Sequence, residues 1–442
     1  MNEKEAMEYI ESLAGCGIRP GLDSIRELCR RLGDPQKSTK WIHIAGTNGK
    51  GSVLAYLSTI LSCAGYRVGR YLSPTIREYR ERFQINGKMI PKKTLGDLME
   101  QVRTACDGMV ADGLAQPTPF EVETALAFLY FREKQCDFGV LEVGMGGRED
   151  ATNVIEGTLI EVITSIGMDH MNFLGKTLPE IAAQKGGIIK PESAVVCMEQ
   201  SAEVMDVIKK TAKEQGARWI CSEYHRASKI CYGLEKQKFT YDRYGRLEIR
   251  LAGKFQIANA ALAADVCSVL EEIGYPVGVE AVRRGLRETV WPGRLTILQK
   301  HPLFIVDGAH NEDAAEKLAE SIEFYFTNRR IIYIMGVLKD KEYDKVIALT
   351  AKYAEQIITV TPPGNPRALP AIDLAQEAAK VHPSVTAAAS LEEAVEIAQL
   401  FAGKDDVILA FGSLSYLGRL MDLLNYEDKA SGKKSIRRKH NG

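Results

Sequence analysis

Residues 45–52 read Ala-Gly-Thr-Asn-Gly-Lys-Gly-Ser and directly follow the apolar run Trp41–Ile44. A second largely apolar stretch, Val53–Ala64, comes next, so the order is a strand, a glycine-rich turn and a helix. Backbone N–H groups in such a turn and at the helix N-terminus point toward anionic oxygens. The segment therefore predicts a polyphosphate site, at which Lys50 reaches the outer phosphates and Ser52 ligates Mg²⁺.

This loop is a variant of the usual phosphate-binding pattern, which has four residues between its glycines and the hydroxyl directly after the lysine. Here only two residues separate Gly46 from Gly49, and Gly51 stands between Lys50 and Ser52. On this window alone, a glycine-rich turn without a ligand remains an alternative.

The overall composition indicates a globular protein of two or three domains. The chain has 442 residues, of which 45% are hydrophobic and 26% charged, with a net charge of −1. Such a balance creates no field that attracts nucleic acid or an anionic membrane. The nine cysteines are scattered singly, which suits reduced thiols better than disulfides or a zinc site. With no apolar leader and no membrane-length apolar run, we expect a soluble cytoplasmic monomer whose partners are small molecules.

Short Val- and Ile-rich runs alternate with amphipathic stretches, which predicts an α/β protein with a parallel sheet flanked by helices. In the first part, the expected strands are 41–45, 67–71, 138–143, 159–165 and 194–198. The expected helices are 53–64, 95–109, 121–134 and 257–273. Residues 217–251 alternate over short segments, such as 237–241 and 246–251, and are expected to form a small antiparallel insertion.

The strongest breaker in the chain is Trp291-Pro292-Gly293-Arg294. Beyond it, strand and helix alternation restarts, which predicts a smaller second α/β domain. The expected division is therefore 1–295, 296–430 and a basic disordered tail, 431–442. Within the second domain, the expected strands are 303–307, 331–335, 357–361 and 407–411, and the expected helices are 312–326, 345–350, 371–381 and 391–402.

Polar side chains follow the carboxyl ends of neighbouring strands, the edge at which open α/β sheets bind ligands. Glu142 ends one strand and His170 follows the next, and both side chains can ligate Mg²⁺ near a phosphate. Asp307 ends a strand of the second domain, where an acid can accept hydrogen bonds from a ribose or cap a helix. Lys185, by composition alone, is an ordinary lysine at a helix C-terminus.

Six motifs in order carry a family resemblance, and together they extend over nearly the whole chain. They are Gly46–Ser52, Glu142–Arg148, Asp150–Asn153, Ser165–His170, Trp291–Arg294 and Asp307–Asn311. The set resembles the folylpolyglutamate synthase and dihydrofolate synthase family, within the Mur-ligase-like amide ligases. The resemblance implies an N-terminal P-loop ATPase domain and a C-terminal Rossmann-like domain, with catalysis in the cleft between them.

The implied reaction joins a folate carboxylate to the amine of L-glutamate with ATP, through an acyl phosphate, and releases ADP and phosphate. The implied substrate is a tetrahydrofolate to be polyglutamylated, and the resemblance leaves open whether dihydropteroate is also an acceptor. The implied cofactors are ATP and two Mg²⁺ ions.

The resemblance also implies roles for single residues. Lys50, Lys185 and His170 are the implied catalytic residues. ATP contacts are implied for Gly49, Lys50, Gly51, Ser52, Asn259, Arg294, Asp307 and His310. The implied metal ligands are Ser52, Ser73, Glu142, His170 and Lys185, the last as a carbamylated lysine that holds the second ion. The pterin is expected at Thr118, Phe120, Glu121, Glu149, Asp150 and Ala151, where Phe120 offers an aromatic face.

Two positions depart from the family pattern. Thr75 stands where a histidine usually follows Ser-Pro, and Gln184 replaces a glutamate beside Lys185.

Two alternatives to a folate ligase remain. A Mur-type enzyme for a UDP-linked precursor would need about 100 residues before the phosphate loop, which here begins at Gly46. An ATP-gated switch protein would need no role for Lys185 or Asp307.

Overall fold

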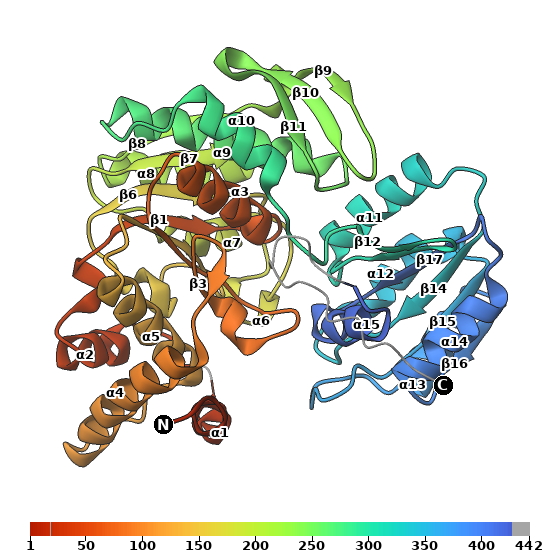
Figure 1. Cartoon of the computed structure of the whole chain (residues 1–442), viewed down its shortest axis with the longest axis horizontal. Coiled ribbons are helices and arrows are strands. Elements are labelled where there is room, and N and C mark those ends of the chain that lie inside the picture. The colour runs from red at the N-terminus through yellow and green to blue at the C-terminus, as the bar shows by residue number, and fades with distance from the viewer. Residues whose placement is uncertain (18, 427–442) are drawn as a thin grey trace, which may run out of the picture.

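The strand before the glycine-rich loop, β1 (Lys40–Ala45), lies inside a large sheet, and five of its six residues are buried. The computed structural model describes residues 1–17 and 19–426. The predicted basic tail, 431–442, lies outside the described residues. Figure 1 shows the N-terminal sheet and its helices beside a second, smaller layered unit.

The N-terminal sheet has eight strands in the order β4-β3-β2-β5-β1-β6-β7-β8. The parallel strands of this sheet are β2, β5, β1, β6, β7 and β8, and β3 and β4 add an antiparallel edge beside β2. Besides β1, the strands are β2 (Val68–Tyr71), β3 (Phe83–Ile85), β4 (Lys88–Met89), β5 (Phe138–Glu142), β6 (Thr158–Ile163), β7 (Ala194–Met198) and β8 (Arg218–Ser222). The predicted parallel sheet is confirmed.

Helices cover both faces of this sheet, because its central strands are apolar on both sides. One face packs against α3 (Lys50–Cys63), α9 (Phe255–Glu272) and α10 (Val279–Glu288). The other face carries α1 (Glu3–Ser12), α2 (Asp23–Arg31), α4 (Lys92–Ala111), α5 (Pro119–Glu133), α7 (Leu178–Gly186) and α8 (Ala202–Glu214). A short helix, α6 (Met171–Leu174), comes after β6 in the chain.

The antiparallel insertion is smaller than the sequence predicts. It consists of β9 (Ser228–Cys231), β10 (Gln237–Tyr241) and β11 (Gly245–Ile249). Residues 218–222, which we expected inside it, instead form β8 and extend the large sheet parallel to β7. The helix α8 crosses over between these two strands, and such a crossover returns the chain parallel to the first strand.

The C-terminal sheet has the order β12-β13-β17-β14-β15-β16, in which only β12 runs antiparallel to its neighbour. Its strands are β12 (Thr296–Lys300), β13 (Leu303–Val306), β14 (Ile331–Met335), β15 (Gln356–Thr359), β16 (Val385–Ala387) and β17 (Val407–Phe411). Its helices are α11 (Glu312–Tyr325), α12 (Tyr343–Thr350), α13 (Ala371–Ala378), α14 (Leu391–Phe401) and α15 (Leu417–Leu423). The predicted second α/β domain is confirmed, and the chain enters it between α10 and β12.

Close packing beside the central strands leaves no room for a side chain at Gly139. A Cβ atom there would lie 2.0 Å from Cζ3 of Trp41, which is fully buried on the neighbouring strand. We expect Gly139→Ala to lower the free energy of unfolding by about 2 kcal/mol, because overpacking forces a rigid core ring to move. Gly15→Ala is the control, since nothing lies within 4 Å of its added Cβ. Denaturant unfolding that gives equal midpoints for the two variants would contradict this packing argument.

Candidate functional site

The glycine-rich loop turns sharply between β1 and α3, and its backbone requires glycine at Gly49. That residue has φ +90°, and a Cβ there would lie 2.7 Å from Oδ1 of Asn259 on α9. Gly51 is equally restricted, because a Cβ would lie 2.7 Å from the Trp291 ring in the linker between the domains. The extra glycine that makes this loop unusual therefore lets the linker pack against the first turn of α3.

Lys50 is the first residue of α3, and its side chain folds back over the loop. Its Nζ donates to the carbonyl oxygens of Gly46 (3.0 Å) and Thr47 (3.1 Å). Burial lowers the pKa of Lys50, and the carboxylates of Glu142 and Asp169 partly oppose that effect. The ammonium group thus faces the loop that would hold phosphates.

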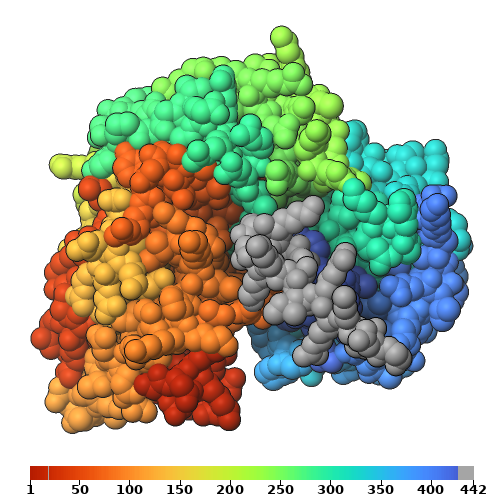
Figure 2. All heavy atoms as spheres, viewed as in Figure 1, coloured from red at the N-terminus to blue at the C-terminus, as the bar shows by residue number. Residues whose placement is uncertain are grey.

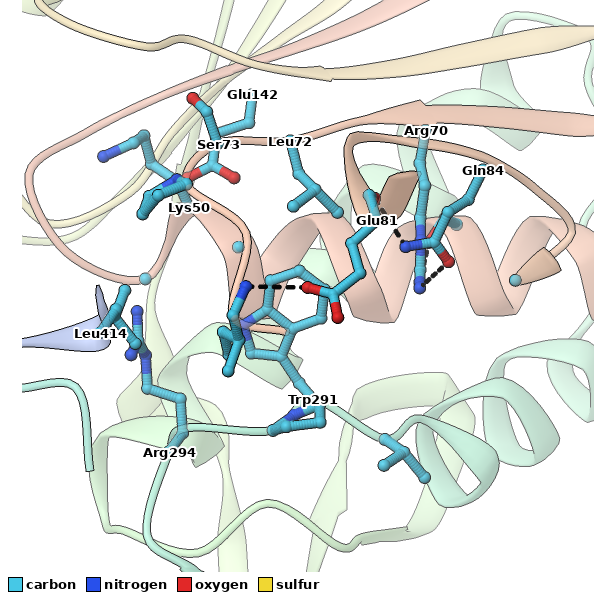
Figure 3. Close-up of a pocket in the computed structure, with 18 of the residues that line it drawn as sticks. Lys50, Arg70, Leu72, Ser73, Glu81, Gln84, Glu142, Trp291, Arg294 and Leu414 are labelled. Atoms are coloured by element: carbon cyan, nitrogen blue, oxygen red, sulfur yellow. Dashed lines mark hydrogen bonds between the residues drawn. The ribbon is translucent and has the colours of Figure 1, made fainter. Parts of the chain in front are cut away.

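A cavity of about 1370 Å³ opens in front of this loop, between the two domains. Figure 2 shows the two domains side by side, one coloured red to green and the other teal to blue. Nine of the predicted site residues line the cavity: Gly49, Lys50, Gly51, Ser73, Glu142, His170, Lys185, Arg294 and His310. In Figure 3, Lys50, Ser73 and Glu142 lie at one end of it, and Arg294 lies across from them.

Glu142 is the buried carboxylate of this site. Desolvation raises its pKa to about 7, although Lys50, Arg294 and the backbone of Ser73 work in the opposite direction. No ion pair to Glu142 occurs among residues 1–17 and 19–426. A carboxylate held in this way lacks a cation close enough to offset its burial.

His170 and Lys185 lie in the same cavity, near Lys50. Burial lowers the pKa of His170, so its ring is neutral and able to act as a metal ligand. Lys185, in the last turn of α7, donates from Nζ to the Gly46 carbonyl oxygen at 2.8 Å. Burial and then the charge of Lys50 lower the pKa of Lys185 to about 7, far below the usual value of a lysine.

The linker and the C-terminal domain supply the opposite wall. Nδ1 of His310 lies 2.7 Å from the Gly308 carbonyl oxygen, so Nδ1 carries the proton and Nε2 is left as an acceptor. Burial lowers the pKa of His310 to about 4, which keeps the ring neutral. Asp307 does not line the cavity, because its two oxygens accept the N–H groups of Leu295 (2.9 Å) and Ala309 (2.8 Å).

Comparison with known proteins agrees with this geometry. The model of the Mur ligase middle domain matches residues 44–267, and that of the Mur ligase glutamate ligase domain matches residues 293–414. A dihydrofolate synthase/folylpolyglutamate synthase of Bacillus subtilis is 36% identical over 425 residues, which cover 94% of this chain and 97% of the relative. The chain belongs to the folylpolyglutamate synthase and dihydrofolate synthase family of Mur ligases.

Solved structures of this family have the same fold. A Mycobacterium tuberculosis folylpolyglutamate synthase complexed with ADP and AMPPCP superposes with a TM-score of 0.88 at 30% identity. The alignment covers 97% of this chain and all of that one. Escherichia coli FolC in complex with DHPP and ADP gives a TM-score of 0.83 at 29% identity, over 96% of this chain and 98% of that one. The predicted family and fold class are thereby confirmed.

Two of the nucleotide and metal residues expected from the family lie beneath the loop, outside the cavity wall. Ser52 is 2% exposed, and its hydroxyl accepts a hydrogen bond from Nε2 of Gln256 at 3.2 Å. Asn259 donates to Oε1 of the same glutamine at 3.0 Å. The structure thus does not bring Ser52 together with Ser73, and its role as a metal ligand stays a prediction.

The residues expected to hold the pterin lie behind the cavity and already have structural partners. Thr118 and Glu121 form the capping box of α5, in which each side chain accepts the other's backbone N–H. Asp150 accepts hydrogen bonds from the N–H groups of Met145 and Thr152, so it fixes the glycine-rich turn after β5. Phe120 lies directly behind Gly144. Ala151 is buried, Glu149 is exposed, and neither lines the cavity.

Sequence reasoning missed the contacts that join the two domains at this site. Lys341, in the loop after β14, forms an ion pair of 3.0 Å with Asp169, and both side chains are at least 87% buried. Asn48 of the glycine-rich loop donates to Asp313 Oδ2 at 2.7 Å. Asn311 donates to Asp169 Oδ2 at 3.2 Å. Asp169 and Asn311 lie inside quoted motifs, whereas nothing in the sequence pattern marks Lys341.

Residues 1–17 and 19–426 contain no group of three His, Cys, Asp or Glu side chains placed to hold a metal ion. Mg²⁺ needs only one or two protein ligands when phosphates and water complete its shell, so this finding is compatible with a family metal site. Among the helices of the same residues, none combines the length and apolarity needed to cross a bilayer.

The ion pair between Lys341 and Asp169 should stabilise the contact between the domains. Burial works to raise the pKa of Asp169, but Lys341 and His170 outweigh it and hold that pKa below its usual range. Such a group adds stability above its unfolded pKa of about 4 and loses it as pH falls further. We expect Lys341→Met to cost about 2 kcal/mol at pH 7, because it leaves a buried carboxylate unpaired.

Chemical unfolding at pH 7 and at pH 3 checks this expectation. The difference between Lys341→Met and the unaltered chain should shrink at pH 3, because Asp169 of the variant has lost the cation that lowered its pKa and takes up a proton. Asp169→Asn combined with Lys341→Met should recover most of the loss. A loss that is the same at both pH values and unchanged in the double variant would argue against the pairing.

Proposed function

We propose that this chain is an ATP-dependent ligase that joins L-glutamate to the carboxylate of a folate, through an acyl phosphate, and releases ADP and phosphate. The observation that carries the proposal is the cavity in which Lys50, Lys185, Glu142 and His170 face Arg294 and His310 across the domain boundary. The curated relatives named dihydrofolate synthase/folylpolyglutamate synthase, and the neighbours solved with ADP, support this activity.

The first step brings two anions together, because the acceptor carboxylate must attack the γ-phosphorus of ATP. The buried ammonium of Lys50, directly behind the loop, offsets their repulsion and stabilises the charge that spreads over the phosphoryl oxygens. Arg294 supplies a second fixed positive charge from the linker side. The bond between the γ-phosphorus and the bridging oxygen breaks, and ADP leaves as the acyl phosphate forms.

The donor set in the cavity fits a magnesium ion. Glu142 is a buried carboxylate without a partner cation among the described residues, and His170 is a neutral imidazole in the same cavity. With Ser73, these are the side chains that would hold Mg²⁺, which would neutralise phosphate charge when bound. The ionised carboxylate of Glu142 is the negative charge that the protein would contribute to that site.

Lys185 is a suitable amine for carbamylation. Its lowered pKa of about 7 leaves much of it as the neutral nucleophile near neutral pH. Addition to CO₂ forms a bond from Nζ to carbon and releases one proton, so a cation becomes a carboxylate. That carboxylate would hold a second Mg²⁺, and it would remove the repulsion between Lys185 and Lys50.

In the second step, the amine of glutamate attacks the acyl carbon, phosphate leaves, and the nitrogen loses a proton. We propose His310 as the group that meets this amine, because its Nε2 is an acceptor and its ring is neutral. Water must be kept from the acyl phosphate, and a cavity closed by two domains serves this purpose. The nucleotide contacts that the family resemblance implies for Asp307 and Asn259 stay predictions.

The proposal also covers the cellular compartment, the oligomeric state and the partners of the protein. Nine cysteines without disulfides, eight of them buried or only partly exposed, suit a reducing cytoplasm. Both walls of the cavity come from one chain, so a monomer suffices for the reaction. The proposed partners are therefore small molecules: ATP, L-glutamate and a pterin-bearing acceptor.

The decisive experiment supplies the purified chain with Mg·ATP, radiolabelled glutamate and either dihydropteroate or tetrahydrofolate as acceptor. The proposal expects labelled product and stoichiometric ADP, each dependent on the acceptor. The comparison between the two acceptors also decides whether the enzyme has one activity or two. ADP release that ignores the acceptor, or no product with either acceptor, would overturn the proposal.

Lys50→Ala should reduce kcat at least about a thousandfold, because a preorganised charge on the transferring phosphoryl group is lost. The fold should remain intact, since the Lys50 side chain only contacts two carbonyl oxygens of its own loop. Lys93→Ala on the exposed start of α4 is the matched control and should keep full activity. Steady-state rates and thermal midpoints measure both effects, and near-normal turnover would remove the phosphate role.

Activity should depend on CO₂ and rise with pH through about 7, because only the neutral amine of Lys185 is carbamylated. Dialysis against CO₂-free buffer should lower the rate, and bicarbonate should restore it. A ¹³C carbamate signal should form with labelled bicarbonate and be absent from Lys185→Arg, which keeps the charge but cannot react. Unchanged rates without CO₂, together with no ¹³C signal, would rule out this modification.

A further inference from the structure

The cavity continues past Trp291, away from Lys50 and Glu142, into a second region that the proposed reaction does not use. We call this region the distal groove and define it by Ser58, Ser62, Arg70, Gln84, Lys88 and Arg284, all of which line the cavity. In Figure 3, Arg70 and Gln84 lie at the opposite end of the view from Glu142, with Trp291 and Leu72 between.

Arg70 occupies a place that strand geometry assigns to the core. Side chains of β2 alternate between the two faces of the sheet, so residue 70 points to the same face as its neighbours Val68 and Leu72. Those two are 1% and 2% exposed and pack with α3. An arginine in this row interrupts an otherwise apolar face, and burial of a guanidinium is costly unless it is used.

Gln84 lies directly opposite Arg70 on β3 and is only 5% exposed. Its Oε1 accepts a hydrogen bond of 2.5 Å from Arg70, and its Nε2 donates to the Glu81 carbonyl oxygen at 2.7 Å. The guanidinium of Arg70 also lies 5.7 Å from the centre of the Trp291 ring. These contacts hold the arginine in a fixed orientation against the cavity.

Two more cations come from separate elements. Lys88 lies on β4 and Arg284 on α10, and neither forms an ion pair with a carboxylate among residues 1–17 and 19–426. Arg284 uses one N–H to reach the Cys63 carbonyl oxygen at 3.1 Å. Other charged side chains of the same wall already pair with one another, as Arg77 does with Asp422 and Arg80 with Glu78. Two further acids line the cavity: Glu81, which accepts the N–H of Ile76 at 2.8 Å, and Glu288, which accepts a hydrogen bond from the Cys63 thiol at 3.8 Å.

The floor of the groove is the C-terminal half of α3, which carries short polar side chains there. Ser58 and Ser62 are one helical turn apart and face the cavity, whereas the other face of this helix is apolar. With a rise of about 1.5 Å per residue, the helix places Ser58 and Ser62 about 12 and 18 Å from Lys50. The groove therefore follows α3, with Arg70 beside Ser58 and Arg284 beside Cys63 at the end of the helix.

We propose that the distal groove binds the chain of γ-linked glutamates already attached to the acceptor, an inference that rests on the proposed function. Such a chain carries one free carboxylate per residue and spans about 6 Å per residue when extended. With its terminal carboxylate at Lys50, the preceding two or three residues would run along α3 to Arg70, Lys88 and Arg284. Trp291 and Leu72 would pack against its methylene groups.

The test compares acceptors that carry one, two and three glutamates. The double variant Lys88→Gln with Arg284→Gln removes two charges from the groove, and Lys93→Gln with Arg287→Gln removes two exposed charges outside it. We expect KM for the triglutamate acceptor to rise on the order of tenfold in the groove variant only, since each lost charge pair weakens binding modestly. kcat, KM for ATP and KM for the monoglutamate should remain unchanged, and Lys88→Arg with Arg284→Lys should retain tight binding.

Three outcomes would overturn the proposal: an equal rise of KM for all acceptors, a rise of KM for ATP, or no change at all. The second would assign the groove to the nucleotide. If the unaltered chain glutamylates no pterin acceptor, the proposed function fails, and equilibrium dialysis with radiolabelled tri-γ-glutamate then decides this inference. Binding that the groove variant weakens would support it, and absent or unaltered binding would overturn it.

Discussion

One carbonyl oxygen lies at the centre of this structure and accepts hydrogen bonds from two buried lysines. Lys50 and Lys185 both reach the oxygen of Gly46, at 3.0 and 2.8 Å, from helices on opposite faces of the sheet. Two ammonium groups so close repel each other when water is excluded, and burial lowers the pKa of both. Bound anions offset this repulsion, and ATP, the acceptor carboxylate and glutamate each carry them. The positive charges of Lys50 and Lys185 therefore favour the binding of an anion, whose negative charge offsets their repulsion.

The same loop also connects the two domains. Asn48, in this loop, donates a hydrogen bond to Asp313 at the start of α11. Asp169, which follows the neighbouring strand β6, forms an ion pair with Lys341 of the C-terminal domain. Hydrogen bonds and charges across a boundary have steep distance dependence, so the C-terminal domain must sit in one place for them to form. The proposed phosphate site and the position of the C-terminal domain consequently depend on the same loop.

Much of this organisation could be predicted from the sequence, because buried parallel strands read as continuous apolar runs and the motifs follow their ends. Residues 41–45 and 331–335 are examples, and Glu142, His170 and Lys185 do meet in one cavity. Residues 218–222 were assigned to the insertion because a short edge strand has no pattern that tells its direction. Lys341 could not be found because a lysine in a loop looks solvated until its partner is known. Arg70 was missed because only the burial of Val68 and Leu72 against α3 shows that its row faces the core.

Trp291 has one more consequence. It belongs to the linker, yet its ring lies against Gly51 in the first turn of α3. The chain has only three tryptophans, and one of them, Trp41, is sealed in the core. The fluorescence of an indole that contacts both α3 and the linker depends on the polarity of that contact. The protein thus carries an intrinsic optical reporter at the place where the linker touches the first turn of α3.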